Sequence, residues 1–212
     1  MYKKILVPLD GSKLAEIALS YTAELIKRLP GVEVDLLHVY NPREKAMAPM
    51  YRAYIEQAAD TIRRQLADAA TKVNGELAIG NTADKILRFS DKHKTDLIIM
   101  ATHGRSGINR WAMGSIAYKV MRSGKKPVCL IRAGTKEKTI IEKANGNIVL
   151  VPLDGTKRAE SVLPYVEKLV KQVGVDKMEV VLLMVCEPPK VSSDYPSTMP
   201  PELGRTRGEG AD

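Results

Sequence analysis

The chain has 212 residues, of which 44% are hydrophobic, 5% are aromatic and 27% are charged, and its formal net charge is +8. The length allows one large domain, or one domain and part of another, with a sizeable apolar core. The few aromatic residues argue against a nucleic-acid binder built on base-stacking side chains. Acidic residues are interleaved with Lys and Arg, so the charge indicates a basic surface rather than a nucleic-acid site.

Neither a membrane segment nor a disulfide framework is predicted. The apolar run before Asp10 is five residues long, which is too short for a signal peptide, and no apolar run is long enough to span a bilayer. Cys129 and Cys186 lie within apolar runs and no CxxC pair occurs, so we expect two buried strand thiols. We therefore expect a cytoplasmic protein that does not bind membranes.

Apolar runs alternate with helical patterns along the first 132 residues. Strands are predicted at residues 3–9, 32–40, 75–81, 95–101 and 126–132, and helices at 13–29, 50–73, 82–93 and 115–123. The run at 95–101 is the most apolar of the strands, which suits a central position covered on both faces. This alternation predicts an α/β fold with a doubly wound, five-stranded parallel sheet of the Rossmann-like type and right-handed crossovers.

The beginning of the chain recurs 144 residues later. Residues 147–170 (NIVLVPLDGTKRAESVLPYVEKLV) match residues 3–26 (KKILVPLDGSKLAEIALSYTAELI), so Asp154 corresponds to Asp10. The copy supplies a strand, a helix and a strand before a Pro- and Gly-rich stretch begins. We therefore divide the chain into a domain at 1–132, a linker at 133–146, a partial second repeat at 147–187 and a disordered tail at 188–212.

The partial repeat is too small to be a good independent domain. One helix covers a single face of a two-stranded sheet and leaves the other face bare. We expect the repeat to pack on the first domain, or on another copy of the chain, with its strands completing the edge of a sheet.

Small residues gather where the strand at 95–101 ends, because the following stretch contains Gly104, Gly107 and Gly114. Glycines let backbone N–H groups approach a ligand, and a helix that begins near Ser115 presents free N–H groups and a partial positive charge. In a doubly wound sheet this loop lies near the turn at Asp10, where the strand order reverses. The pattern indicates a phosphate site, although such glycines also form plain turns, and neither a Walker loop nor a GxGxxG motif is present.

The chain resembles the universal stress protein family in three stretches: ILVPLDGS, TDLIIMATHGRSG and GSIAYKVMRSGKKPVCLI. The ATP-binding branch of that family has the spacing G-x2-G-x9-G-[ST], which falls here on Ala101, Gly104, Gly114 and Ser115. Alanine replaces the first glycine and is unstrained only if its φ stays negative. The resemblance implies an adenine nucleotide α-hydrolase-like fold of the tandem type, with an incomplete second repeat that lacks the motif.

The resemblance also implies one site for an adenine nucleotide, ATP or AMP, with Mg²⁺ accompanying the phosphates. Its candidate residues lie at the ends of the first, second and fourth strands and at the start of the helix at 115–123. They are Pro8, Asp10, Val39, Ala101, Thr102, His103, Gly104, Arg105, Ser106, Gly107, Gly114, Ser115 and Ile116.

Several of these residues have a structural alternative. Asp10 contacts the ribose or a metal by resemblance, or it shapes the turn before the first helix. Ser115 binds a phosphate or caps its helix, and Arg105 binds phosphate or stays in solvent. His103 has no partner placed for catalysis by the sequence, so we expect it to shape the loop rather than act as a base.

The resemblance implies a stress-response regulator whose nucleotide state biases an interaction with a protein partner, and a homodimer built on the outer strand at 126–132. We do not expect an enzyme, because the sequence assigns neither a catalytic base nor an arginine finger, and any ATP hydrolysis should be slow. Two alternatives stay open: a nucleotide-free scaffold or oligomerisation module, and a slow ATP-cleaving enzyme.

Overall fold

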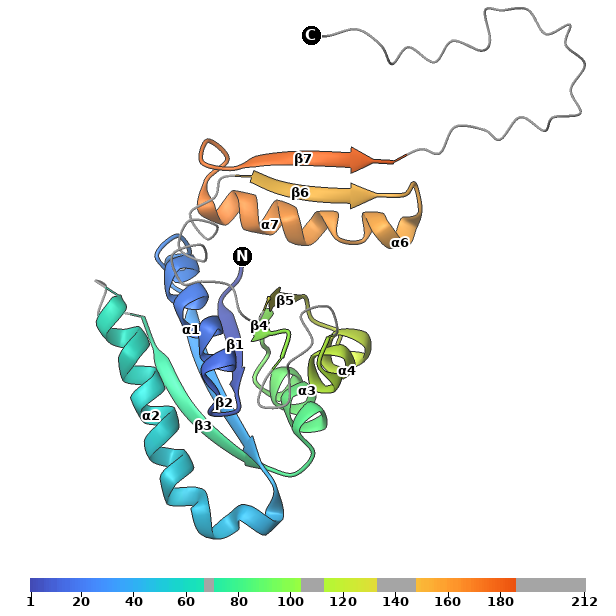
Figure 1. Ribbon diagram of the computed structural model, residues 1–212. Coiled ribbons are helices and arrows are strands. Elements are labelled where there is room, and N and C mark those ends of the chain that lie inside the picture. Colours follow the sequence, from blue (N-terminus) through green and yellow to red (C-terminus); the bar gives the residue numbers. More distant parts are fainter. Residues whose placement is uncertain (67–70, 104–112, 133–147, 186–212) are drawn as a thin grey trace, which may run out of the picture.

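A five-stranded sheet forms the centre of the first domain (Figure 1). The computed structural model describes residues 1–66, 71–103, 113–132 and 148–185. The strands are β1 (Lys4–Leu9), β2 (Glu33–Tyr40), β3 (Val73–Ile79), β4 (Leu97–Ala101) and β5 (Val128–Ile131), all parallel to their neighbours in the order β3-β2-β1-β4-β5. The predicted doubly wound parallel sheet is therefore confirmed, and β4 lies inside it.

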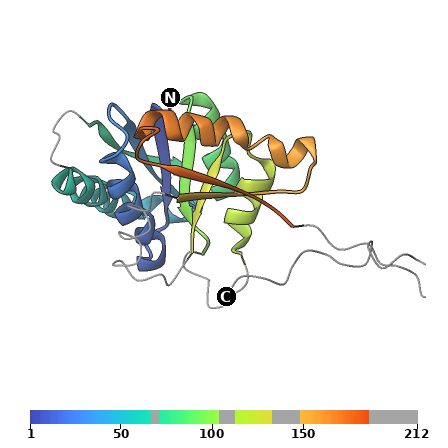
Figure 2. The ribbon, with the colours of Figure 1, turned by 90° about the horizontal axis from the view of Figure 1, so that it is seen from above.

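Helices cover both faces of this sheet (Figures 1 and 2). They are α1 (Lys13–Ile26), the 3₁₀ helix η1 (Pro42–Met47), α2 (Ala48–Gln65), α3 (Thr82–Lys92) and α4 (Ser115–Ser123). One apolar cluster joins α1 and α2 to one face of the strands, and a second joins α3 and α4 to the other. All five residues of β4 are buried, because the strand is covered from both sides.

The second predicted helix is wrong at its carboxyl end. The three- and four-residue spacing of apolar residues runs on to Val73, but α2 ends at Gln65. Val73 instead begins β3, where it pairs with Val34 and is 4% exposed. A buried β-branched residue fits a strand as well as a helix face, so periodicity alone did not separate the two. The 3₁₀ helix η1 was not predicted.

The second copy forms a small unit of its own. It consists of β6 (Ile148–Leu153), α6 (Lys157–Glu160), α7 (Leu163–Val173) and β7 (Glu179–Met184). Its two strands pair in parallel with each other and do not extend the five-stranded sheet, so the expected completion of that sheet's edge is wrong within one chain. Pro164 lacks the N–H that would bond to Glu160, and one predicted helix is thereby divided into α6 and α7.

The second copy packs on the first domain through α7, as Figures 1 and 2 show. The Gln172 side-chain amide accepts a hydrogen bond from the Tyr2 N–H at 2.6 Å and donates one to the Tyr2 carbonyl at 2.8 Å. The Tyr2 hydroxyl donates to the Tyr165 carbonyl at 3.1 Å. Val173 joins the apolar cluster beneath α1. The contact therefore lies at the amino-terminal end of β1.

Two further predictions concern the outer strand and the membrane. Cys129 lies in β5 at the edge of the sheet, and burial raises the pKa of its thiol. Cys186, the linker at 133–146 and the tail at 188–212 lie outside the described residues. Within the part of the chain that the structure describes, no helix has the length and apolarity needed to cross a membrane.

Candidate functional site

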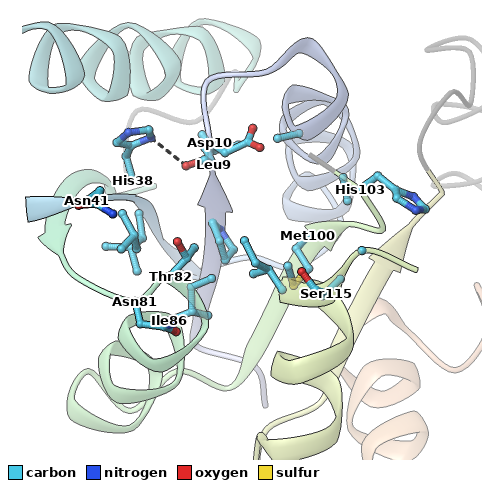
Figure 3. Close-up of a pocket in the computed structure, with 18 of the residues that line it drawn as sticks. Leu9, Asp10, His38, Asn41, Asn81, Thr82, Ile86, Met100, His103 and Ser115 are labelled. Atoms are coloured by element: carbon cyan, nitrogen blue, oxygen red, sulfur yellow. Dashed lines mark hydrogen bonds between the residues drawn. The ribbon is translucent and has the colours of Figure 1, made fainter. Parts of the chain in front are cut away.

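A cavity of about 430 Å³ opens at the carboxyl ends of the strands, where the strand order reverses between β1 and β4 (Figure 3). Its size is typical of small-molecule sites. Nine of the predicted site residues line it: Pro8, Asp10, Val39, Ala101, Thr102, His103, Gly114, Ser115 and Ile116. The other four, Gly104, Arg105, Ser106 and Gly107, lie outside the described residues.

Asp10 both shapes a turn and lines the cavity. Its Oδ1 accepts hydrogen bonds from the Ser12 N–H at 2.9 Å and from the Ser12 hydroxyl at 2.6 Å. Ser12 in turn caps α1 by accepting from the Ala15 N–H at 3.1 Å. Gly11 has a φ of 83°, a conformation that glycine adopts without strain. The turn thus holds the Asp10 carboxyl group beside the cavity.

The amino end of α4 opens into the same cavity. Gly114 is its N-cap, and the Gly114 N–H donates to the Thr102 carbonyl at 2.9 Å. A Cβ at Gly114 would lie 3.0 Å from that oxygen, a tight contact, so the close approach favours glycine. The first hydrogen bond within the helix is made by Tyr118. The N–H groups of Ser115, Ile116 and Ala117 therefore have no hydrogen-bond partner among the described residues, and Ser115 does not cap the helix.

The end of β4 forms the wall next to α4. Ala101 has no positive φ, so alanine is unstrained in place of the family's glycine. The Thr102 N–H donates to the Ile131 carbonyl at 2.8 Å, which ties the chain to β5. The His103 Nδ1 lies 3.3 Å from the Thr102 hydroxyl oxygen, a local contact that agrees with a loop-shaping role.

The backbone of Val39 also faces the cavity, which the sequence did not predict. The Glu33 N–H donates to the Lys3 carbonyl, and the Tyr40 carbonyl accepts from the Gly80 N–H on the opposite side. Because backbone groups alternate along a strand, the N–H and C=O of Val39 point toward β1. The ladder with β1 ends one residue earlier, at His38. In a parallel ladder the Leu9–His38 pair is closed by the Val39 N–H donating to the Leu9 carbonyl. Val39 therefore offers its carbonyl oxygen, an acceptor, to the cavity.

His38 of β2 also lines the cavity, although its sequence context marks it only as a strand residue, and it is 2% exposed. Its Nδ1 donates to the Leu9 carbonyl at 2.9 Å, which fixes the ring beside the end of β1 (Figure 3). The ring packs on Tyr51 with centroids 4.5 Å apart and on Tyr54 at 5.8 Å. Burial raises the pKa of Tyr54, and the nearby carboxylates raise it further, so this phenol stays neutral.

Polar residues from the starts of η1 and α3, which follow β2 and β3, complete the rim, and sequence reasoning missed them. They are Asn41, Glu44, Asn81 and Thr82, and beneath them lie the apolar side chains of Leu37, Ile86 and Met100. The two asparagines are recognisable in sequence as helix N-caps, but nothing local shows that they border a cavity. Asp10 and Glu44 are its acidic residues, and none of the described lining residues is Lys or Arg.

The comparisons with known proteins agree with this architecture. The model of the universal stress protein family matches residues 1–132. The chain is 28% identical over 156 residues to the universal stress protein MJ0577 of Methanocaldococcus jannaschii, covering 62% of this chain and 96% of the relative. The solved structure of MJ0577 has a TM-score of 0.55 at 30% identity and covers 64% of this chain and 99% of that one.

Two further solved structures share the fold. A universal stress protein solved with cAMP has a TM-score of 0.51 at 24% identity, covering 63% of this chain and 98% of its own. A universal stress protein of Archaeoglobus fulgidus has a TM-score of 0.65 at 22% identity. It covers 90% of this chain and 68% of its own, so the likeness extends beyond the first domain into the second copy.

Proposed function

Because the chain belongs to the universal stress protein family, we propose that its cavity binds an adenine nucleotide, ATP or AMP. The observation that carries the proposal is the start of α4 inside the cavity. Three N–H groups, those of Ser115, Ile116 and Ala117, are left without partners there among the described residues. Such groups, with the positive end of the helix dipole, favour a phosphate without needing a lysine.

The opposite side of the cavity suits adenine. The base is proposed to lie against the apolar side chains of Pro8 and Val39. The C=O of Val39 would accept a hydrogen bond from the 6-amino group of adenine. Guanine presents a carbonyl oxygen in place of this amino group, which the Val39 carbonyl cannot bind. The backbone of β2 thus favours adenine over guanine.

Asp10 is the proposed contact for the ribose or for a Mg²⁺ ion bound with the phosphates. Mg²⁺ in nucleotide sites is usually held by one or two carboxylates together with phosphate oxygens. Asp10 supplies a carboxylate at the cavity, so the residues present fit the ion. The ion would neutralise phosphate charge, and Asp10 would hold it.

A protein of the same fold binds cAMP, which supports an adenine nucleotide as the class of ligand. We propose a regulator rather than an enzyme: a cytoplasmic stress-response protein whose bound nucleotide biases the binding of a protein partner. The homodimer built on β5 also stays a prediction. The second candidate is a nucleotide-free scaffold, favoured by the exposed apolar side chains of the second copy, such as Leu150 at 56% and Leu182 at 58%.

Mass spectrometry of small molecules released from the denatured, purified chain tests the proposal. We expect ATP or AMP, and calorimetry should show binding of the same nucleotide with Mg²⁺ present. If calorimetry at high protein concentration detects no binding of either nucleotide, the scaffold is the better description. Release of many product molecules per chain each minute from ATP would instead establish an enzyme.

A further inference from the structure

The polar side chains at the β2 and β3 side of the cavity are mostly engaged in capping helices. The Asn41 Oδ1 accepts from the Arg43 N–H at 3.0 Å, and a Glu44 carboxylate oxygen accepts from the Asn41 N–H at 3.0 Å. The Asn81 Oδ1 accepts from the Asp84 N–H at 3.2 Å. These bonds hold η1 and α3 in place.

Thr82 differs from these residues. It is the first residue of α3, it lines the cavity, and its side chain is half-buried. Its hydroxyl has no hydrogen-bond partner among the described residues, and Figure 3 shows that hydroxyl directed into the cavity. A hydroxyl can donate and accept at once. Thr82 therefore presents a versatile hydrogen-bonding group to a ligand.

The helix that carries Thr82 is held firmly. Asn81 caps it, and Ala83 and Ile86 are 3% and 1% exposed within the apolar cluster of that face. Asp84 forms an ion pair with Lys119 of α4 at 2.8 Å. A group on such a rigid element loses little freedom when it binds, so its hydrogen bonds favour the ligand strongly.

The position of Thr82 corresponds to the base of the proposed nucleotide. The phosphates are placed at α4, which follows β4, and the ribose at Asp10, which follows β1. The base then extends to the end of β2, about 10 Å from β4 at two strand spacings. N7 and the 6-amino group form one edge of adenine, and the 6-amino group and N1 form the adjacent edge. With the N1 edge against the end of β2, the edge that carries N7 would face the wall that α3 forms.

We propose that the Thr82 hydroxyl recognises the adenine base, accepting a hydrogen bond from the 6-amino group and donating one to N7. This inference rests on the proposed nucleotide site and adds a side chain that selects the base. Val39 would bind one edge of adenine through its backbone, and Thr82 would bind the adjacent edge. Adenine is then distinguished from a base that lacks the 6-amino group or N7.

The test compares AMP with 7-deaza-AMP, which lacks N7, by calorimetry on the full chain. Each hydrogen bond contributes about 1 kcal/mol, so Thr82→Val should weaken AMP binding about thirtyfold. The same change should weaken 7-deaza-AMP binding only about fivefold, because one of the two bonds is already missing. Thr82→Ser keeps the hydroxyl and should bind AMP within about threefold of the natural chain.

Thr61→Val is the matched control, because Thr61 is a half-buried threonine on α2 that does not line the cavity, and its hydroxyl bonds to the Gln57 carbonyl at 2.9 Å. It should leave both affinities unchanged. If Thr82→Val leaves AMP binding unchanged, or weakens both ligands equally, the role of Thr82 is wrong while the nucleotide site stands. If the natural chain binds neither AMP nor ATP, the site itself is wrong and the role of Thr82 fails with it.

Discussion

The turn after β1 and the turn after β6 have nearly the same sequence and the same local geometry. Asp154 accepts from the Thr156 N–H at 2.9 Å and from its hydroxyl at 2.7 Å, as Asp10 does from Ser12. Gly155 has a φ of 80°, close to the 83° of Gly11. The three residues Asp-Gly-Ser or Asp-Gly-Thr therefore specify this turn without help from the rest of the fold.

The surroundings of the two turns differ. β1 has neighbours on both sides, whereas β6 pairs with β7 alone among the described strands. Asp10 therefore faces the start of α4 across a cavity, and Asp154 is exposed. Hydrogen bonds from Thr156 lower the pKa of Asp154, which a turn explains without any ligand. The comparison shows that neighbouring residues determine the conformation of the turn, whereas a binding site also requires β4 and α4 beside it.

The largest difference between the copies should appear in stability. Leu6 is 0% exposed and its counterpart Leu150 is 56% exposed. Leu6→Ala should lower the free energy of unfolding by about 2–5 kcal/mol, because it leaves a cavity between β1 and the helices of that face. Leu150→Ala should lower it by less than about 1 kcal/mol. Denaturant titration measures both, and equal losses would contradict the difference in burial.

The attachment of the second copy should be the next most sensitive feature. Gln172→Leu removes both amide bonds to Tyr2 and leaves the buried Tyr2 backbone without partners, at a cost of about 1–3 kcal/mol. Limited proteolysis should then cut residues 148–185 about tenfold faster or more, while residues 4–101 stay protected. The exposed Lys171→Ala is the control. An unchanged cleavage rate in Gln172→Leu would show that these bonds do not hold the unit.

The smallest expected effect is a difference in nucleotide affinity between substitutions at Asp10 and at Asp154. Asp10→Asn keeps the oxygen that accepts from Ser12 but removes the charge, so the turn should persist. In the presence of Mg²⁺ we expect AMP or ATP to bind about tenfold more weakly, through loss of a charge-assisted contact. Asp154→Asn should leave the affinity unchanged. Equal effects from both substitutions, measured by calorimetry, would remove Asp10 from the site.

Sequence patterns predicted the fold well wherever each apolar run corresponds to a single strand or helix. The five strands, the order in which helices separate them and the inside position of β4 follow from composition and periodicity. The carboxyl end of α2 did not follow, because Val73 continues the helical spacing yet pairs with Val34. The detached sheet of the second copy did not follow either, since strand pairing between distant segments leaves no local pattern.

Part of the candidate site could also be predicted from sequence patterns. Ala101, Gly114 and Ser115 come from a spaced motif, and Asp10 comes from a turn, so each could be named in advance. His38 and Thr82 could not, because one resembles any strand residue and the other resembles any helix start. Their place at the cavity depends on two features: β2 continues for two residues beyond its pairing with β1, and α3 lies beside the end of β3.

By itself the sequence determined the local structures: the Asp-Gly-Ser and Asp-Gly-Thr turns, the alternation of strands and helices, and the glycine at the start of α4. Each depends on neighbouring residues, whose conformational preferences act over a few bonds. Tertiary structure alone decided that one aspartate faces a cavity and the other faces solvent. It also decided that the Val39 backbone and the Thr82 hydroxyl face that cavity. Those outcomes depend on which distant strands and helices pack together, and that packing places the partners of each group.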